Sequence, residues 1–392
     1  MTTNAGPLAG IRVLDLSSYI AAPYGCTLLA DQGAEVLKIE SPEGDNLRNY
    51  PSTLRSEGRA FLGVNRGKSG MVLDLKQAGA QEVFDRLLRA TDVLVHNFRA
   101  GVPERLGIGY GALHARHPRL IYCAVSGYGE TGPLRSRAGY DQVLQAMSGL
   151  CAMQGTPEKP QIVYGSVVDY YAAALLASGV ASALYERSRT GAGRLVAVSL
   201  LRSALAMQSA RMVWADNEPR EVSRDMRSGG ITGLHPTLAG QLYLSANTPH
   251  FWSALCQLLG LEDLATDPRY DTVRKRAQHT DVLVSRVRAT LAGRSALEWE
   301  ALLGERVPCA ATRQIEDMFD HPQVHAEGML DHFEHPAVGG FRGLSRAIEF
   351  GTVPATPAIP APTLGQHTDT VLRGLDYSAD EIAALRCARV VA

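Results

Sequence analysis

The residue best suited to covalent chemistry is Asp169, which lies in the segment 165–171 (GSVVDYY) at the start of an apolar helical stretch. An aspartate at a helix start is commonly an N-cap, because its carboxylate accepts hydrogen bonds from free N–H groups. The same position suits a nucleophile, since a carboxylate facing an apolar pocket loses its water shell. The pattern alone favours the N-cap, and both interpretations stay open at this point.

A glycine-dense segment, 127–133 (GYGETGP), follows a predicted strand. In open α/β sheets, ligands bind beyond the carboxyl ends of the strands. This segment is therefore either a simple turn or a loop that brings backbone N–H groups to a ligand. Residues alone do not decide between the two.

Metal chemistry and the common hydrolase motifs are not indicated. A cluster of histidines occurs, but no second ligand pair frames it, so surface histidines are favoured over a metal site. The chain has no G-x-S-x-G, Walker or H-E-x-x-H motif, and the turn after its first predicted strand lacks the glycines of a dinucleotide-binding loop. The four clustered histidines are His321, His325, His332 and His335.

The elements that must position these residues alternate between strands and helices over the first 200 residues. This alternation is typical of an α/β fold with a Rossmann-like open parallel sheet. A polar, glycine-rich stretch over 216–234 then leads into a smaller α+β unit. Strands are predicted at 11–16, 34–40, 71–76, 92–97, 119–125, 194–200 and 241–246. Helices are predicted at 21–32, 80–90, 103–116, 169–187, 250–260, 279–292 and 296–305, with a last helix from Ser378.

The amino-acid composition indicates which classes of partner the protein is not expected to bind. The chain of 392 residues has a formal net charge of −1, without the basic excess of nucleic-acid-binding proteins. We expect no membrane partner, because no continuous apolar run approaches the roughly 18 residues of a membrane span. The start of the chain lacks the features of a signal peptide. Six dispersed cysteines without a Cys-x-x-Cys pair favour a reducing, cytoplasmic location.

Ordered sequence blocks along nearly the whole chain carry a family resemblance. They include 7–16 (PLAGIRVLDL), 33–40 (GAEVLKIE), 97–99 (NFR), 139–141 (GYD) and 364–369 (LGQHTD). With these blocks the chain resembles the class III CoA-transferases, which include formyl-CoA, carnitine and bile-acid CoA-transferases. The resemblance implies a large α/β CoA-binding domain formed by 1–224 and 326–392, with a small α+β domain at 225–325. It also implies an interlocked homodimer.

The resemblance implies that Asp169 is the catalytic nucleophile of a ping-pong reaction. Its carboxylate would attack the donor thioester to give a mixed anhydride, which CoA thiolate would convert to an aspartyl-CoA thioester. Tyr140 would donate a hydrogen bond near the anhydride. CoA thioesters and small carboxylic acids would be substrates, and no cofactor would be permanently bound.

Further family positions map onto this chain. Lys76 and Arg105 would meet phosphates, and Leu73 and Phe98 the adenine or pantetheine. Arg48, like Arg99 and Arg137, is a candidate to hold a second carboxylate of the substrate. The glycines Gly229 and Gly230 are candidates for a loop over the site. The expected CoA-binding residues are Tyr19, Ile20, Ala21, Leu73, Lys76, Asn97, Phe98 and Arg105.

Two alternatives accompany this interpretation. The 2-methylacyl-CoA racemases of the same fold use a histidine where Tyr140 stands, and a tyrosine with a pKa of about 10 is a poor base. A non-catalytic acyl-CoA-binding protein would not need an intact Asp169. Overall likeness favours succinyl-CoA as donor and itaconate, mesaconate, citramalate or glutarate as acceptor. Ile20 replaces the glutamine of one branch, which argues against oxalate.

Overall fold

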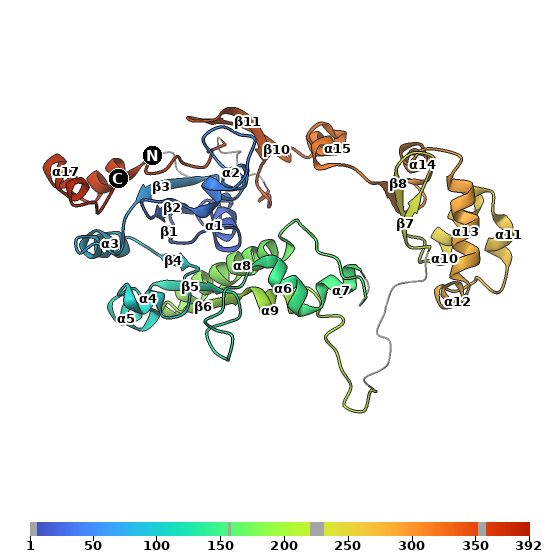
Figure 1. Ribbon diagram of the computed structural model, residues 1–392, viewed down its shortest axis with the longest axis horizontal. Helices are drawn as coiled ribbons and strands as arrows, with labels where there is room; N and C mark the ends of the chain where they lie inside the picture. The colour runs from blue at the N-terminus through green and yellow to red at the C-terminus, as the bar shows by residue number, and fades with distance from the viewer. Residues whose placement is uncertain (1–5, 156–157, 220–230, 352–357) are drawn as a thin grey trace. The chain divides into compact units, whose positions relative to one another are not determined.

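The computed structural model describes residues 6–155, 158–219, 231–351 and 358–392. The chain divides into two compact units (Figure 1). The first unit is built from 1–213 and 323–392, and the second from 214–322. The predicted loop glycines Gly229 and Gly230 lie outside the described residues.

The first unit is organised by a six-stranded parallel sheet in the order β3-β2-β1-β4-β5-β6. Its inner strands are rich in Val, Leu and Ile and are buried on both faces, as parallel strands covered by helices require. The predicted α/β class with a Rossmann-like parallel sheet is confirmed. The strands are β1 (Arg12–Asp15), β2 (Glu35–Glu40), β3 (Lys68–Val72), β4 (Val93–His96), β5 (Ile121–Ser126) and β6 (Leu195–Ser199).

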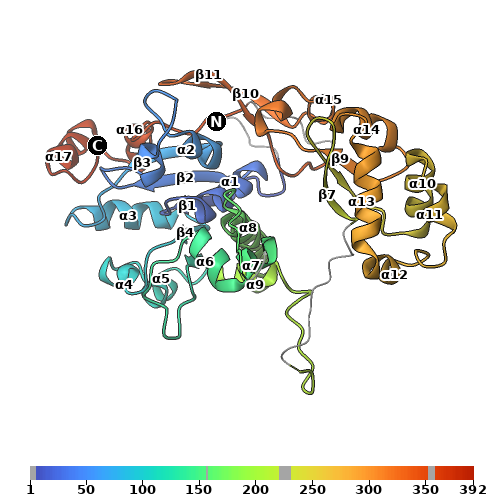
Figure 2. The same cartoon turned by 45° about the vertical axis from the view of Figure 1, so that its right-hand side comes forward.

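Helices cover both faces of this sheet (Figure 2). On one face, a core cluster joins the sheet to α1 (Ala21–Asp31), α6 (Asp141–Ser148), α8 (Val167–Thr190) and α9 (Leu200–Ala206). On the other face, a second cluster joins it to α3 (Ala80–Arg89), α5 (Tyr110–Arg116), α16 (Thr368–Gly374) and α17 (Ala379–Cys387). The end of the chain thus returns to the first unit, where Asp74 N donates to Val390 O at 2.9 Å.

Three predicted boundaries were wrong. The strand expected at 71–76 begins earlier, at Lys68. The helix expected over 103–116 is two helices, α4 (Val102–Arg105) and α5, because Gly107 adopts a φ of +73° between them. Helix α8 begins at Val167, which makes Asp169 its third residue rather than its N-cap.

Helix α8 is also long and apolar enough, by length and composition, to cross a membrane. The sequence predicted a helix at 169–187 but no apolar run of membrane-spanning length. In the structure α8 packs closely against α1, and a Cβ added at Gly25 would lie 2.9 Å from the side chain of Leu176. Its buried face belongs to the core of the first unit.

The second unit is an α+β body around a three-stranded antiparallel sheet of β7 (Gly233–Pro236), β8 (Gln241–Leu244) and β9 (Cys309–Ala311). Trp252 and Trp299 are buried in its core. Its helices are α10 (Pro249–Leu259), α11 (Glu262–Thr266), α12 (Val273–Gln278), α13 (Thr280–Leu291) and α14 (Ala296–Leu303), with a 3₁₀ turn η2 at Ile315–Asp320.

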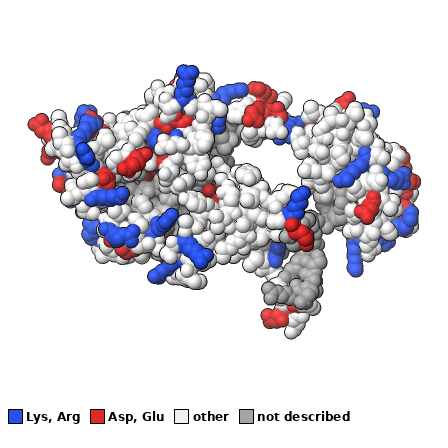
Figure 3. Space-filling model, in the orientation of Figure 1, with Lys and Arg blue, Asp and Glu red and all other residues white. Residues whose placement is uncertain are grey.

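Shorter elements complete the chain. They are η1 (Asn46–Asn49), α2 (Arg59–Asn65), α7 (Leu150–Gln154), α15 (Pro322–Ala326) and the antiparallel hairpin of β10 (Leu330–His335) and β11 (Gly339–Leu344). On the visible surface of the first unit, Lys and Arg side chains are interspersed with Asp and Glu (Figure 3).

Candidate active site

The turn that follows β1 is held by buried side chains on every side. Asp15 accepts from Ser17 N at 2.9 Å, and Lys38 Nζ donates to Ser17 O at 2.8 Å. Asn97 bonds both the N–H and the carbonyl of Ser18, at 3.0 and 2.7 Å. Each of these peptide groups is satisfied without water, so the turn is rigid.

Two buried ion pairs lie beneath this turn. Lys38 pairs with Asp45 at 2.9 Å, and Lys68 pairs with Asp15 at 2.8 Å; all four side chains are fully buried. Burial alone would raise the pKa of Asp15, but Lys68 and Lys38 lower that pKa to about 2. The Asp15 carboxylate therefore remains ionised, and its charge is compensated by lysines rather than by solvent.

Tyr19 ends the turn in a strained conformation, with a φ of +67°. A bulky residue adopts this region only when its surroundings enforce it. The enforcing contact is a hydrogen bond from Tyr19 N to Asp45 at 3.1 Å. The Tyr19 ring meets the edge of Tyr140 at 5.5 Å, and their hydrogen bond, followed by burial, raises the pKa of Tyr19 to about 12. Tyr19 thus stays protonated and able to donate.

Asp169 lies in the first turn of α8, whose backbone amides bond the first residue of α6. Asp141, the residue after Tyr140, accepts from Val168 N at 2.7 Å and from Asp169 N at 3.0 Å. The N-cap role considered for Asp169 is therefore filled by Asp141, from a segment 28 residues away. Burial, and then the charge of Asp141, raises the pKa of Asp169 to about 7.

A raised pKa identifies Asp169 as the unusual carboxylate of this region. Its neighbour Tyr170 packs edge-on against Tyr24 of α1, at a ring distance of 4.9 Å. A partly buried carboxylate without a cationic partner keeps its basicity, which is what covalent catalysis by a carboxylate requires. The geometry fits the nucleophile interpretation of Asp169.

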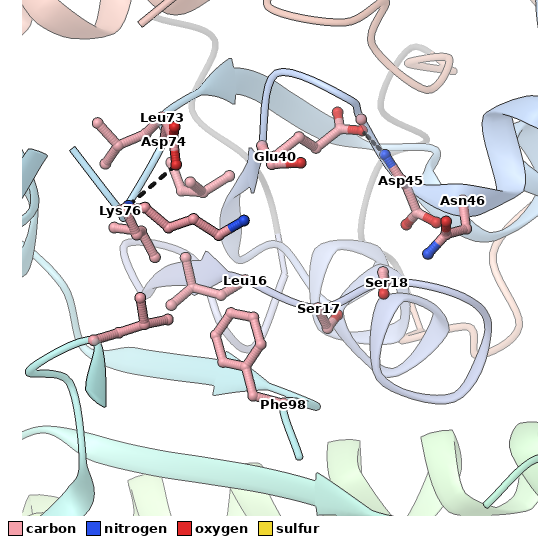
Figure 4. Close-up of a pocket in the computed structure, with 15 residues that line it drawn as sticks. Leu16, Ser17, Ser18, Glu40, Asp45, Asn46, Leu73, Asp74, Lys76 and Phe98 are labelled. Atoms are coloured by element: carbon pink, nitrogen blue, oxygen red, sulfur yellow. Dashed lines mark hydrogen bonds between the residues drawn. The ribbon is translucent and has the colours of Figure 1, made fainter. Parts of the chain in front are cut away.

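A pocket opens at the carboxyl ends of β1, β2, β3 and β4, where the strand order reverses direction. Its volume is about 230 Å³. The ammonium group of Lys76 and the ring of Phe98 point into it (Figure 4). Leu73 lies opposite the turn residues Ser17 and Ser18. The pocket therefore combines apolar walls, a cation and hydroxyl groups.

The structure brings only part of the predicted site into this pocket. Leu73, Lys76 and Phe98 line it, whereas Asn97 holds the neighbouring turn. Arg105, the last residue of α4, is not among the lining residues, although the adjacent Leu106 is. Two further predicted positions, Ile20 and Ala21, form the N-cap and first residue of α1.

Arg48 has a different environment from the predicted one. It donates to Glu40 and to Glu57, each at 2.7 Å, and to the carbonyl of Pro362 at 3.0 Å. Its guanidinium also stacks 3.7 Å above the ring of Phe61. A role in holding a substrate carboxylate would require these buried bonds to break, so the structure assigns Arg48 to the interior framework.

Metal-binding geometry is not found in the part of the chain that the structure describes. No group of three or more His, Cys, Asp or Glu side chains there is arranged to hold a metal ion. His332 instead contacts Glu334 at 2.9 Å on the exposed hairpin. His335 accepts from the N–H groups of Ala337 and Val338, each at 3.2 Å.

Three residues that organise this region escaped the sequence analysis: Asp141, Lys38 and Asp45. Asp141 and Lys38 lie in sequence blocks that were noted, whereas Asp45 does not. The partners of these residues lie in other segments or on another strand. A buried lysine beside a strand-end aspartate is recognisable only when the strands are placed next to each other.

Comparisons with known proteins show the family to which this chain belongs. Residues 8–368 match CoA-transferase family III. A succinyl-CoA:glutarate CoA-transferase of Mus musculus is 32% identical, with 98% of this chain and 90% of the mouse protein covered. An acetyl-CoA:oxalate CoA-transferase of Acetobacter aceti is 35% identical, with 83% and 85% covered.

The fold leads to the same group of proteins. A crystal structure of Rv3272 from Mycobacterium tuberculosis superposes with a TM-score of 0.82 at 31% identity, covering 94% of this chain and 99% of that one. The likeness extends over both the parallel-sheet unit and the smaller unit. The family match spans the strands, the pocket and Asp169 alike. This chain belongs to CoA-transferase family III.

Proposed function

We propose that this CoA-transferase moves CoA from succinyl-CoA to a small dicarboxylate through covalent intermediates on Asp169. The observation that carries the proposal is the Asp169 carboxylate, whose pKa is raised to about 7 and which no cation neutralises among the described residues. Relatives named for glutarate and oxalate support a dicarboxylate acceptor. Itaconate, mesaconate and citramalate extend the same class.

The proposed reaction has two symmetrical halves. Asp169 forms a C–O bond to the donor carbonyl as the C–S bond breaks, and CoA leaves as its thiolate. The thiolate then attacks the aspartyl carbonyl, which forms aspartyl-CoA and releases the donor acid as its carboxylate. An acceptor carboxylate repeats these steps in reverse order. One carboxylate can thus serve both substrates with the same geometry.

We propose that the first unit binds CoA in the pocket lined by Leu73, Lys76 and Phe98. The cation suits a phosphate and the apolar walls suit the adenine or pantetheine. Tyr140, held against Tyr19, would donate a hydrogen bond near the anhydride.

We also propose that the protein forms an interlocked homodimer. The dimer would cover Val143 and Met147, which are large apolar residues exposed on α6. Sedimentation velocity tests this assembly.

An acceptor screen tests the function. Purified protein and succinyl-CoA are incubated with mono- and dicarboxylic acids, oxalate included, and acyl-CoA products are measured by mass spectrometry. We expect a new acyl-CoA with at least one dicarboxylate. Products from monocarboxylates alone would contradict the acceptor class. Exchange of the α-proton of a 2-methylacyl-CoA in deuterated water, without transfer, would establish the racemase alternative instead.

The raised pKa of Asp169 makes a pH prediction. The nucleophile is the carboxylate, and in the free enzyme it is half protonated near pH 7. We therefore expect kcat/KM to rise about tenfold per pH unit below that pKa and to level off above it. Initial rates across the range, with enzyme stability checked at each pH, would measure this limb. A profile that is flat down to roughly pH 5 would show an ordinary aspartate pKa instead.

A further inference from the structure

The first turn of α8 directs its N–H groups away from the nucleophile. An acidic residue in a first helical turn ordinarily benefits from the free amide donors there. In this protein Asp141 Oδ2 accepts from both Val168 N and Asp169 N. As a result, no group within the described residues donates a hydrogen bond to the side chain of Asp169.

Asp141 is itself held in place. It is the first residue of α6 and is only 2% exposed. Gln145, one turn later, donates to its other carboxylate oxygen. Gln145 is anchored in turn by Val163, whose N–H donates to it at 3.0 Å and whose carbonyl accepts at 2.8 Å. Within the described residues, Asp141 has hydrogen-bond donors but no cationic partner.

We propose that Asp141 is a positioning residue for the reaction, because it occupies the amide donors of α8 and so leaves the Asp169 carboxylate unbonded and nucleophilic. This inference rests on the proposed role of Asp169 as nucleophile. Hydrogen bonds to a carboxylate stabilise its ionised form and lower its basicity. A carboxylate deprived of them is the better nucleophile.

The charge of Asp141 acts in the same direction. When Asp169 attacks the donor thioester, its negative charge leaves with the CoA thiolate, and it then leaves the site with the released acid. The aspartyl-CoA intermediate is neutral at that position. Repulsion from Asp141 therefore raises the free energy of the unacylated carboxylate but not that of the acylated one. Acylation relieves this repulsion.

Among the residues that the structure describes, the other titratable groups near Asp169 do not supply an opposing charge. Tyr170 comes from α8 itself, and burial raises its pKa. Tyr24 reaches Tyr170 from α1, and burial raises its pKa as well. Behind Tyr24, Arg66 is paired with Asp31 at 2.8 Å. Asp141 is accordingly the charged group that raises the pKa of Asp169.

Two substitutions distinguish the effect of the hydrogen bonds that Asp141 accepts from the effect of its negative charge. Asp141→Asn retains an oxygen that can accept both amides but removes the negative charge. Asp141→Ala removes both, which frees the amides to bond Asp169. The readouts are kcat and the midpoint of the acid limb of kcat/KM. Gln142→Ala is the matched control on α6, because Gln142 is half-buried and its side chain makes no hydrogen bond within the described residues.

We expect Asp141→Ala to lower the acid-limb midpoint by about one pH unit or more and kcat by about 100-fold. Asp141→Asn should lower the midpoint by less and kcat by about tenfold or less. Gln142→Ala should change neither. If Asp141→Ala does not fold, Asp141→Asn alone carries the test. An unmoved acid limb in the folded Asp141 variants would overturn the inference and leave a structural role only.

Failure of the proposed function gives a different result. If the parent enzyme forms no aspartyl-CoA adduct with succinyl-CoA, or if an Asp169 variant still turns over, the nucleophile assignment is wrong. A different outcome is that the adduct forms and depends on Asp169, while the midpoint of the acid limb of kcat/KM is unchanged in the Asp141 variants. In that case only the inference about Asp141 is wrong.

Discussion

Replacing Asp169 with alanine is expected to abolish CoA transfer, with a loss of about 10⁴-fold or more in kcat. The proposed bonds to the donor acyl group and to CoA are both made by this carboxylate. No described carboxylate can substitute for it, because Asp141 is occupied by Gln145 and by two amides of α8. The rate is measured from acyl-CoA products with the best acceptor from the screen.

Intact-protein mass spectrometry adds a direct test of the covalent step. With succinyl-CoA and no acceptor, the parent enzyme should gain the mass of CoA less one water. The Asp169→Ala variant should gain nothing. Turnover by the variant at more than about one per cent of the parent rate would rule out the covalent mechanism.

Removing the charge of Asp169 should make the protein more stable at neutral pH, although it abolishes activity. The pKa of Asp169 is raised in the folded protein, so the folded state binds the proton more tightly than the unfolded chain does. Ionisation of Asp169 therefore destabilises the fold progressively as the pH rises from about 4 to about 7. Asp169→Asn should increase the free energy of unfolding by roughly 1–2 kcal/mol above pH 7, after allowance for solvent screening.

This increase should disappear below about pH 4, where the aspartate is protonated in both states. Denaturant unfolding at the two pH values measures the difference. A variant that is inactive and also less stable at neutral pH would show that Asp169 supports the fold rather than the chemistry.

Replacing Lys68 with methionine is expected to destabilise the protein by about 3–5 kcal/mol. Lys68 Nζ is fully buried and bonds Asp15 at 2.8 Å, Asn65 at 2.8 Å and the Pro23 carbonyl at 2.7 Å. Methionine fills a similar space but leaves the Asp15 carboxylate buried with less compensation. The midpoint of denaturant unfolding, compared at equal slope, measures the loss.

Lys76→Met is the matched control for this substitution. Lys76 is exposed at the pocket, and its side chain has no ion pair within the described residues, so its loss should change stability by about 0.5 kcal/mol or less. The double variant Lys68→Met with Asp15→Asn should recover part of the stability, because the uncompensated charge is removed. Equal stability of the Lys68 and Lys76 variants would contradict a structural role for the buried pair.

The sequence by itself determined the class of the fold and led to Asp169 as the proposed nucleophile. Short Val- and Ile-rich runs alternating with helical stretches can satisfy their buried backbone only as a parallel sheet covered by helices. The capping signal at Ser378 is local, and the structure shows the Ser378–Glu381 capping box. Asp169 was identified by resemblance, since its own pattern favoured an ordinary cap.

Only the tertiary structure shows how the helix start around Asp169 is held. Asp141 lies 28 residues before Asp169, and its capping of α8 depends on how α6 and α8 meet. The environment of Arg48 likewise could not be predicted from the sequence, because the carbonyl of Pro362 reaches it from a segment 314 residues away. Helix capping, ion pairing and burial of charge all depend on contacts between side chains. Where the side chains come from distant segments, these contacts form only when the sheet and its helices have assembled.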